Sequence, residues 1–410
     1  MKVYSTFGHL SMALVIVGCF MPTRCIGNDL AIVNGPQNQS EAETKEKPDQ
    51  KSTKEKSKAS KKKQPAVDIA ILLDTSNSMD GLISQAQNQL WNIVRKISEA
   101  EKKNQKPSLR VAVFEYGNSN LPASENYIRQ VVQLTDDLDK VSEGLFQLKT
   151  DGGDEYCGAV IQEAIRRLDW SSRQNGYKAI YIAGNEPFTQ GDIDYEATCR
   201  EAIEKGIVVN TIHCGDYDRG VEGQWKRGAE IAEGKFMNIN QDRKIVQIKT
   251  PHDGLLIQLN AELNSTYLWY GSSAERDAFQ SNQIMQDKNS ITAGSSLSRI
   301  ATKAGSAYSN RGRDLIDSSK SNADFLKGVD PKLLPEAMQK MSRKEREEYV
   351  ESMAKKRQSI QVKIAEATKQ RDEFIAAQLK SQAGDTSDTF GDVINEAVAS
   401  QLQEFGFEVE

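Results

Sequence analysis

Apolar runs and polar gaps alternate between residues 67 and 240 with two different periods. Runs that are almost continuously apolar, such as VDIAILLD at 67–74, predict buried strands. The next segment has apolar residues three and four positions apart, from Leu82 to Ile97, which predicts a helix packed on one face. The predicted strands cover 67–74, 109–117, 127–134, 177–184, 207–215 and 235–240, and the predicted helices cover 82–97, 137–148, 159–168, a segment ending at Gly206 and a segment around Ala229.

This order predicts an α/β fold with a doubly wound, mostly parallel sheet that has helices on both faces. Strands 109–117 and 127–134 are separated by a short polar loop, so we expect a hairpin that makes one edge strand antiparallel. After Asn240 the pattern weakens. Residues 255–271 fit a further helix and strand docked on the sheet, and 281–322 fit helical pieces with flexible joints.

A long helix is expected near the carboxyl terminus. The sequence SRKE, from Ser342 to Glu345, is a capping box, and neither Pro nor Gly follows until Gly384. A helix of up to about 40 residues follows from this. Its apolar residues recur every seven positions, at Met353, Ile360, Ala367 and Phe374. So thin a stripe indicates packing on another helix rather than a stable coiled coil, and we expect a long helix or helical hairpin over 331–384 and a tail over 385–410.

The amino-terminal segment has a different composition. An apolar run of about 12 residues follows Lys2, which suits a signal peptide over 1–27 and is too short to span a bilayer. The run contains IVGC, which resembles the lipobox of bacterial lipoproteins and implies a lipid anchor on Cys19; the alternative is cleavage near Gly27. Residues 28–66 are nearly all polar or charged, which predicts a disordered linker. We therefore expect an exported protein, located in the periplasm, in the cell envelope or outside the cell.

Charge and cysteine content narrow the possible functions. The 53 Lys and Arg residues nearly balance 58 Asp and Glu residues, and no basic patch contains interleaved aromatics, so nothing favours nucleic-acid binding. Beyond the predicted signal peptide, the cysteines are Cys157, Cys199 and Cys214, whose spacing fits no zinc site. Three cysteines allow at most one internal disulfide, and we expect it to join Cys157 to Cys214 if one forms.

The predicted first strand ends in Asp74-Thr75-Ser76-Asn77-Ser78, at the sheet edge where α/β proteins bind ligands. This D-x-S-x-S sequence resembles the signature of von Willebrand factor A domains. The resemblance implies a metal-ion-dependent adhesion site in which Asp74, Ser76 and Ser78 hold Mg²⁺ or Mn²⁺ and leave a position for an acidic side chain of a protein ligand. The alternative is that these three side chains cap the following helix.

The other two ligand loops depart from the family pattern. The second loop of the family often reads G-G-T, and here Asp154 follows the glycine pair, so it is the positional match, with Glu155 beside it. The third loop usually reads T-D-G-x-P, and here Gly184 replaces the aspartate. The loss should weaken metal binding, although Asn185 or Glu186 could reach the ion through water.

The resemblance extends beyond the signature. The strand and helix order fits a von Willebrand A domain over 67–250, followed by an extension with linker helices over 251–330. The blocks GGDEYCGAVIQEAI, IAGNEPFTQG and VNTIHCG are similar to those of exported bacterial von Willebrand A proteins with a helical carboxyl-terminal part. That resemblance supplies no biochemical activity.

The sequence gives little support for an enzyme. It contains no P-loop, HExxH or G-x-S-x-G motif. Asp216 and Asp218 could pair as acid and base, but acidic loops of this kind are usually only solvated. The sequence therefore predicts a non-enzymatic binding protein for a protein partner, with an oligomeric state that it does not specify. The alternative is a scaffold with a vestigial metal site that acts through its carboxyl-terminal helices.

Overall fold

The structure is a computed structural model that describes residues 64–409, except 174–175, 244–247, 323 and 382–388. The expected signal peptide and Cys19 lie outside the described residues, as does nearly all of the expected linker. Among the helices that are described, none combines the length and the hydropathy needed to cross a lipid bilayer.

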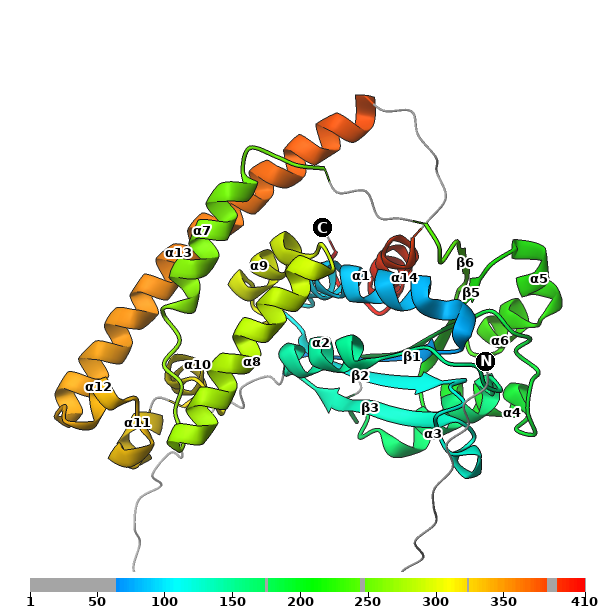
Figure 1. The fold of residues 1–410 in the computed structure, drawn as a ribbon, viewed down its shortest axis with the longest axis horizontal. Coiled ribbons are helices and arrows are strands. Elements are labelled where there is room, and N and C mark those ends of the chain that lie inside the picture. The colour runs from blue at the N-terminus through cyan, green and yellow to red at the C-terminus, as the bar shows by residue number, and fades with distance from the viewer. Residues whose placement is uncertain (1–63, 174–175, 244–247, 323, 382–388, 410) are drawn as a thin grey trace, which may run out of the picture. The chain divides into compact units, whose positions relative to one another are not determined.

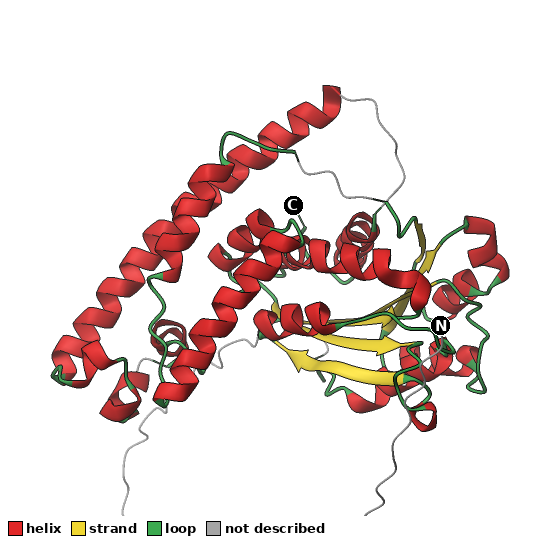
Figure 2. Ribbon diagram, viewed as in Figure 1, coloured by secondary structure: helices red, strands yellow, loops and turns green. Residues whose placement is uncertain are grey.

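A six-stranded sheet forms the centre of the amino-terminal half (Figures 1 and 2). Its strands are β1 (Ala66–Asp74), β2 (Ser108–Tyr116), β3 (Ile128–Thr135), β4 (Tyr177–Gly184), β5 (Val208–Cys214) and β6 (Phe236–Ile239). Their order across the sheet is β3-β2-β1-β4-β5-β6, and only the edge strand β3 runs antiparallel to its neighbour. The predicted fold class, including the single antiparallel edge strand, is confirmed.

Helices cover both faces of the sheet. They are α1 (Asp80–Glu99), α2 (Leu138–Gln147), α3 (Cys157–Arg167), α4 (Tyr195–Glu204), α5 (Tyr217–Glu222) and α6 (Trp225–Ile231), with short 3-10 turns at Asn77–Met79 and Ala123–Glu125. Alternate residues of β1 point to opposite faces. Ile71 therefore belongs to the apolar cluster that includes residues of α1 and α2, whereas Leu72 belongs to the cluster that includes residues of α3 and α4. Because both faces are covered, every residue of β1 is buried.

The carboxyl-terminal half is helical. Its helices are α7 (Asp253–Asn264), α8 (Ser273–Thr292), α9 (Ser296–Ala304), α10 (Leu315–Ser321), α11 (Phe325–Gly328), α12 (Glu336–Gln339), α13 (Arg343–Ser381) and α14 (Phe390–Glu404), with a 3-10 turn at Pro331–Leu333. The expected helix within 255–271 is present as α7. The expected strand is not, because Trp269 forms only an isolated bridge with Asp314 and joins no sheet.

Helix α13 contains 39 residues and begins with the predicted capping box: the Ser342 amide donates to Glu345 Oε2 (2.7 Å), and the Glu345 amide donates to Ser342 Oγ (3.4 Å). Helix α13 lies along α7 (Figure 1) and also contacts α9. Ile360 and Ile364 of its apolar stripe are buried. The long helix thus uses its stripe for packing within the chain.

Residues 385–410, expected as a tail, contain a packed helix instead. Helix α14 lies against α1, and its Val398 and Leu402 are completely buried. Its Gln401 also enters the core, where the side chain accepts a hydrogen bond from the Tyr177 hydroxyl (2.5 Å) and donates one to Asn210 Oδ1 (2.8 Å). The expectation of a tail is therefore wrong. Helix α14 has 15 residues, which is long enough to bury an apolar face against α1, a segment distant in the sequence.

Candidate functional site

The strand β1 delivers Asp74 to the carboxyl edge of the sheet, beside the ends of β2 and β4. Its side chain is fully buried, and Oδ1 accepts a hydrogen bond from the Ser76 amide (2.7 Å). Burial raises the pKa of the Asp74 carboxyl above its usual value. A strand end thus holds a carboxylate away from water in a fixed orientation.

The two serines do not act as helix caps. Ser76 is the residue before the 3-10 turn, and its side chain makes no capping hydrogen bond. The residue before α1 is Met79, so Ser78 does not occupy the N-cap position of that helix. Ser78 Oγ accepts a hydrogen bond from Asn185 Nδ2 (3.1 Å), which joins the first loop to the loop after β4. The capping alternative therefore does not account for these hydroxyl groups.

In the second loop, the carboxyl group that meets Asp74 belongs to Glu155. Asp154 is exposed, and its Oδ2 accepts a hydrogen bond from the Tyr156 hydroxyl (3.1 Å). Glu155 is buried, and its amide donates to Gln190 Oε1 (2.7 Å), which fixes the loop. Burial, and next the neighbouring Asp74 charge, raise the pKa of Glu155 to about 9.

The third loop has no room for the aspartate of the family pattern. A Cβ atom on Gly184 would collide with the Tyr116 hydroxyl and lie 3.1 Å from Asp74 Oδ2. The Tyr116 hydroxyl is held there by a hydrogen bond to the Ala183 carbonyl (3.0 Å). The Tyr116 hydroxyl thus occupies the space that a side chain at position 184 would need, and glycine fits there.

Four buried oxygen atoms at this edge have no well-aligned hydrogen-bond donor among the described residues. They are Asp74 Oδ2, Ser76 Oγ, Glu155 Oε2 and Asn185 Oδ1. A protonated Glu155 carboxyl and the Ser76 hydroxyl nevertheless lie close enough to interact with Asp74. Buried polar atoms are normally satisfied, so such a group needs an explanation. Oxygen atoms of carboxylate, hydroxyl and amide groups are the ligands that Mg²⁺ and Mn²⁺ prefer. The donor set therefore fits a hard divalent cation.

The described residues contain no cluster of three or more His, Cys, Asp or Glu side chains arranged to hold a metal. A cation at this edge would thus rely on two carboxylates, with hydroxyl, amide and water oxygens completing its shell. Such a site has fewer charged ligands than one with a third carboxylate, so it should bind more weakly.

The sequence of residues 68–238 matches the family described as the von Willebrand factor type A domain. This region is a von Willebrand factor type A domain. Its mostly parallel sheet with one antiparallel edge strand is the arrangement that the order of strands and helices predicted. No curated protein matches the chain.

Solved structures similar to this chain include other A-domain proteins. Proximal thread matrix protein 1 from the mussel byssus is 14% identical, with a TM-score of 0.33 over 44% of this chain and 43% of that chain. A second structure of the mussel protein, 16% identical (TM-score 0.33, 44% and 43% covered), is described as having a zinc-occupied MIDAS motif. BatB from Bacteroides thetaiotaomicron is 17% identical (TM-score 0.33, 42% and 90% covered). The chain thus spans less than half of the mussel protein.

The cysteines in the described part of the A domain are all free and buried: Cys157 begins α3, Cys199 lies in α4 and Cys214 ends β5. The conditional pairing of Cys157 with Cys214 is not formed. Asp216 has a structural use, because its Oδ1 accepts hydrogen bonds from the Asp218 and Arg219 amides and so caps α5.

Stability of the metal-free domain should depend on pH through Glu155. The folded-state pKa of about 9 lies above the ordinary value of 4.5, so the folded protein holds this proton more tightly than the unfolded chain does. Its stabilising contribution is complete below pH 4.5 and is lost as the pH rises toward 9. We expect Glu155→Gln to flatten the fall in unfolding free energy between pH 5 and 9, as measured by urea unfolding in EDTA. Glu204→Gln, an exposed control on α4, should retain the wild-type slope, and equal slopes in all three proteins would contradict the assignment.

Proposed function

We propose that the A domain binds a protein partner through a divalent cation, Mg²⁺ or Mn²⁺. The observation that carries this proposal is the group of four buried oxygen atoms without a well-aligned hydrogen-bond donor among the described residues, at the end of β1. Asp74, Ser76 and Glu155 would hold the ion, with Ser78 and Asn185 beside them. The ion would supply an open position for a carboxylate of the partner.

Glu155 takes the role that the sequence pattern gave first to Asp154. Its burial favours the protonated form, so a bound cation must displace a proton. Asp154 and Glu186 are exposed near the same edge, where they would act through water or on the partner. Metal binding should therefore strengthen as the pH rises, up to the pH at which the metal hydroxide forms.

Binding rather than catalysis is the proposal, since A-domain proteins are typically binding or scaffold proteins. We also propose that the protein acts after export, in the periplasm, at the cell envelope or outside the cell, because its first residues have the pattern of a signal peptide. A lipid on Cys19 would attach it to a membrane.

The test is a thermal-shift titration with Mg²⁺ and Mn²⁺ after EDTA treatment. A saturable site should stabilise the wild-type protein by about 2.7 kcal/mol at a hundredfold excess over Kd. Asp74→Asn should abolish this gain, because it removes a charged ligand while keeping the side-chain shape. Asp154→Asn, a matched change in the exposed neighbouring loop, should retain most of it.

Two results would contradict the proposal. One is stabilisation by the cation that is equal in the wild type and in Asp74→Asn. The other is that neither Mg²⁺ nor Mn²⁺ stabilises the wild-type protein. The scaffold alternative would then be preferred. It is supported by the helical half, where the long α13 packs on α7 and α9 and leaves Val362 64% exposed.

A further inference from the structure

A cavity of about 510 Å³ lies beside the proposed cation site. Its base is formed by the end of β5, at His213 and Cys214. One wall is the loop after β4, with Glu186, and the other is α5, with Glu222. The cavity therefore opens at the same carboxyl edge of the sheet as Asp74, where ligands of open α/β sheets bind.

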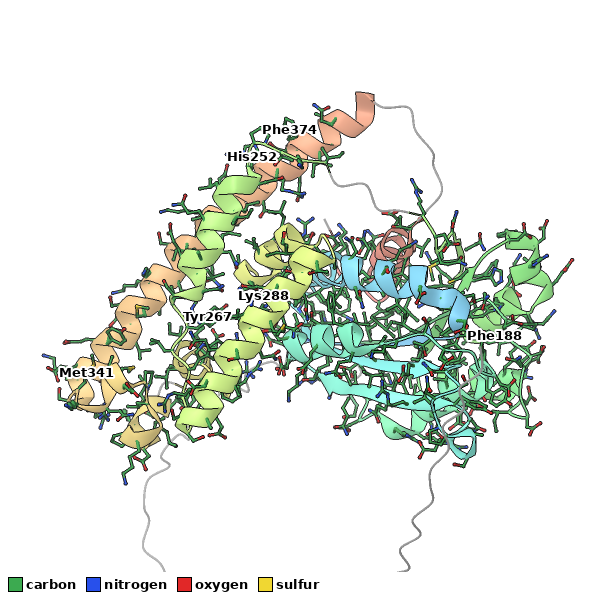
Figure 3. The ribbon with its side chains drawn as sticks, viewed as in Figure 1. Phe188, His252, Tyr267, Lys288, Met341 and Phe374 are labelled. Carbon is green, nitrogen blue, oxygen red and sulfur yellow. The ribbon has the colours of Figure 1, made fainter. Side chains whose placement is uncertain are left out.

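Contacts between the two walls hold the cavity in shape. The Phe188 amide donates to the Gly223 carbonyl (2.8 Å), which ties the β4 loop to the end of α5. Trp225 Nε1 donates to the Glu186 carbonyl (2.8 Å). Phe188 itself (labelled in Figure 3) is fully buried. It packs edge-on against Trp225, with 4.9 Å between ring centroids. A ligand would thus meet walls that need little ordering on binding.

Asn185 belongs to both the cavity and the cation site. Its side chain lines the cavity and donates to Ser78 Oγ, whereas its buried Oδ1 has no partner among the described residues. The charge of Glu186 also acts on Glu155 at the cation site. The two places are therefore adjacent enough for one short peptide segment to occupy both.

The cavity carries an excess of negative charge. Its charged lining residues are Glu186, Asp216 and Glu222, against the single cation Arg219. Asp216 caps α5 through its side chain. Within the described chain, Glu186, Glu222 and Arg219 of the cavity lining form no ion pair. Two exposed carboxylates thus line a preformed cavity that contains one arginine, Arg219, with which neither forms an ion pair.

We propose that this cavity binds a basic side chain, Lys or Arg, of the same partner segment that offers an acidic residue to the cation. The inference rests on the proposed function, since it assigns a second contact to the same partner. The segment would place its carboxylate at Asp74 and Glu155, and its ammonium or guanidinium group between Glu186 and Glu222. The domain would then select a partner whose segment carries an acidic and a basic side chain close together.

The test uses fluorescein-labelled synthetic peptides with one Asp and one Arg, zero to four residues apart in a Gly-Ser background. Binding to the full chain is measured by fluorescence polarisation in Mg²⁺. At the best spacing, the Arg peptide should bind about fivefold more tightly than its Arg→Gln or Arg→Leu counterpart, as expected for an exposed charge pair. The advantage should shrink as NaCl is raised, because salt screens exposed charges.

Protein variants locate the contact. The double variant Glu186→Gln, Glu222→Gln should reduce the Arg advantage to less than about twofold. Glu204→Gln, which removes an exposed carboxylate of α4 outside the cavity, should leave it unchanged. An equal gain from Leu, no gain from Arg, a gain that survives in the double variant, or no binding of any peptide would each overturn the inference.

The design separates this inference from the proposed function. If Arg→Gln weakens binding while Asp→Asn in the peptide and EDTA have no effect, the cavity assignment stands and the cation proposal fails. If Asp→Asn and EDTA weaken binding while Arg→Gln does not, the cation proposal stands and the cavity assignment fails.

Discussion

Shortening the chain after Ser381 is expected to abolish cooperative folding of the A domain. The deletion removes α14, whose buried apolar side chains are Phe390, Val393, Ile394, Ala397, Val398 and Leu402. Burial of one large apolar side chain contributes about 1.5–3 kcal/mol, so the group together approaches the 5–15 kcal/mol stability of a typical domain. The deletion also leaves Tyr177 and Asn210 without their contacts to Gln401 inside the core.

Urea unfolding followed by circular dichroism measures this effect. The shortened chain should show no cooperative transition, or should aggregate. Leu402→Ala in the full chain should cost about 2–5 kcal/mol and retain a single transition. Val362→Ala, which removes an exposed apolar side chain from α13, should change stability by less than about 0.5 kcal/mol. A shortened chain with the wild-type midpoint would show that α14 is dispensable.

Arg299→Met is expected to be the most damaging single substitution in the helical half. The guanidinium group is 1% exposed and lies between Asp139 of α2 and Asp287 of α8, with both contacts at 2.6 Å. It also stacks over Trp91 of α1, 4.6 Å from the ring centroid. Met preserves much of the volume but removes the guanidinium group from both carboxylates. The buried Asp139 keeps a hydrogen bond from the Tyr308 hydroxyl, and the partly buried Asp287 keeps the Lys303 ammonium group. Loss of one member of a buried ion pair costs about 3–5 kcal/mol.

The same denaturant measurement tests this prediction. Arg200→Met is the matched control, because Arg200 forms an ion pair with Glu196 on the surface of α4, where its side chain is 53% exposed. Such a pair is worth about 1 kcal/mol or less. A loss in Arg299→Met no greater than that in Arg200→Met would mean that the buried network does not join the two halves of the protein.

The sequence by itself determined the elements of the A domain. The continuous apolar run of β1 and the three-to-four spacing of α1 are local patterns, and each reflects the faces that a strand or helix must bury. The capping box at Ser342 likewise located the start of α13 from four adjacent residues. D-x-S-x-S located Asp74 because the motif lies within one turn after one strand.

The tertiary structure decided what depends on contacts between distant segments. Asp154 and Glu155 are neighbours with the same charged group, and only the path of their loop against Gln190 turns Glu155 toward Asp74. Helix α14 meets α1 across some three hundred residues, a contact that no local pattern encodes. The cavity likewise exists because Phe188 and Trp225 hold two separate loops together. Local patterns define which surfaces must be buried, whereas their partners are chosen by the packing of the whole chain.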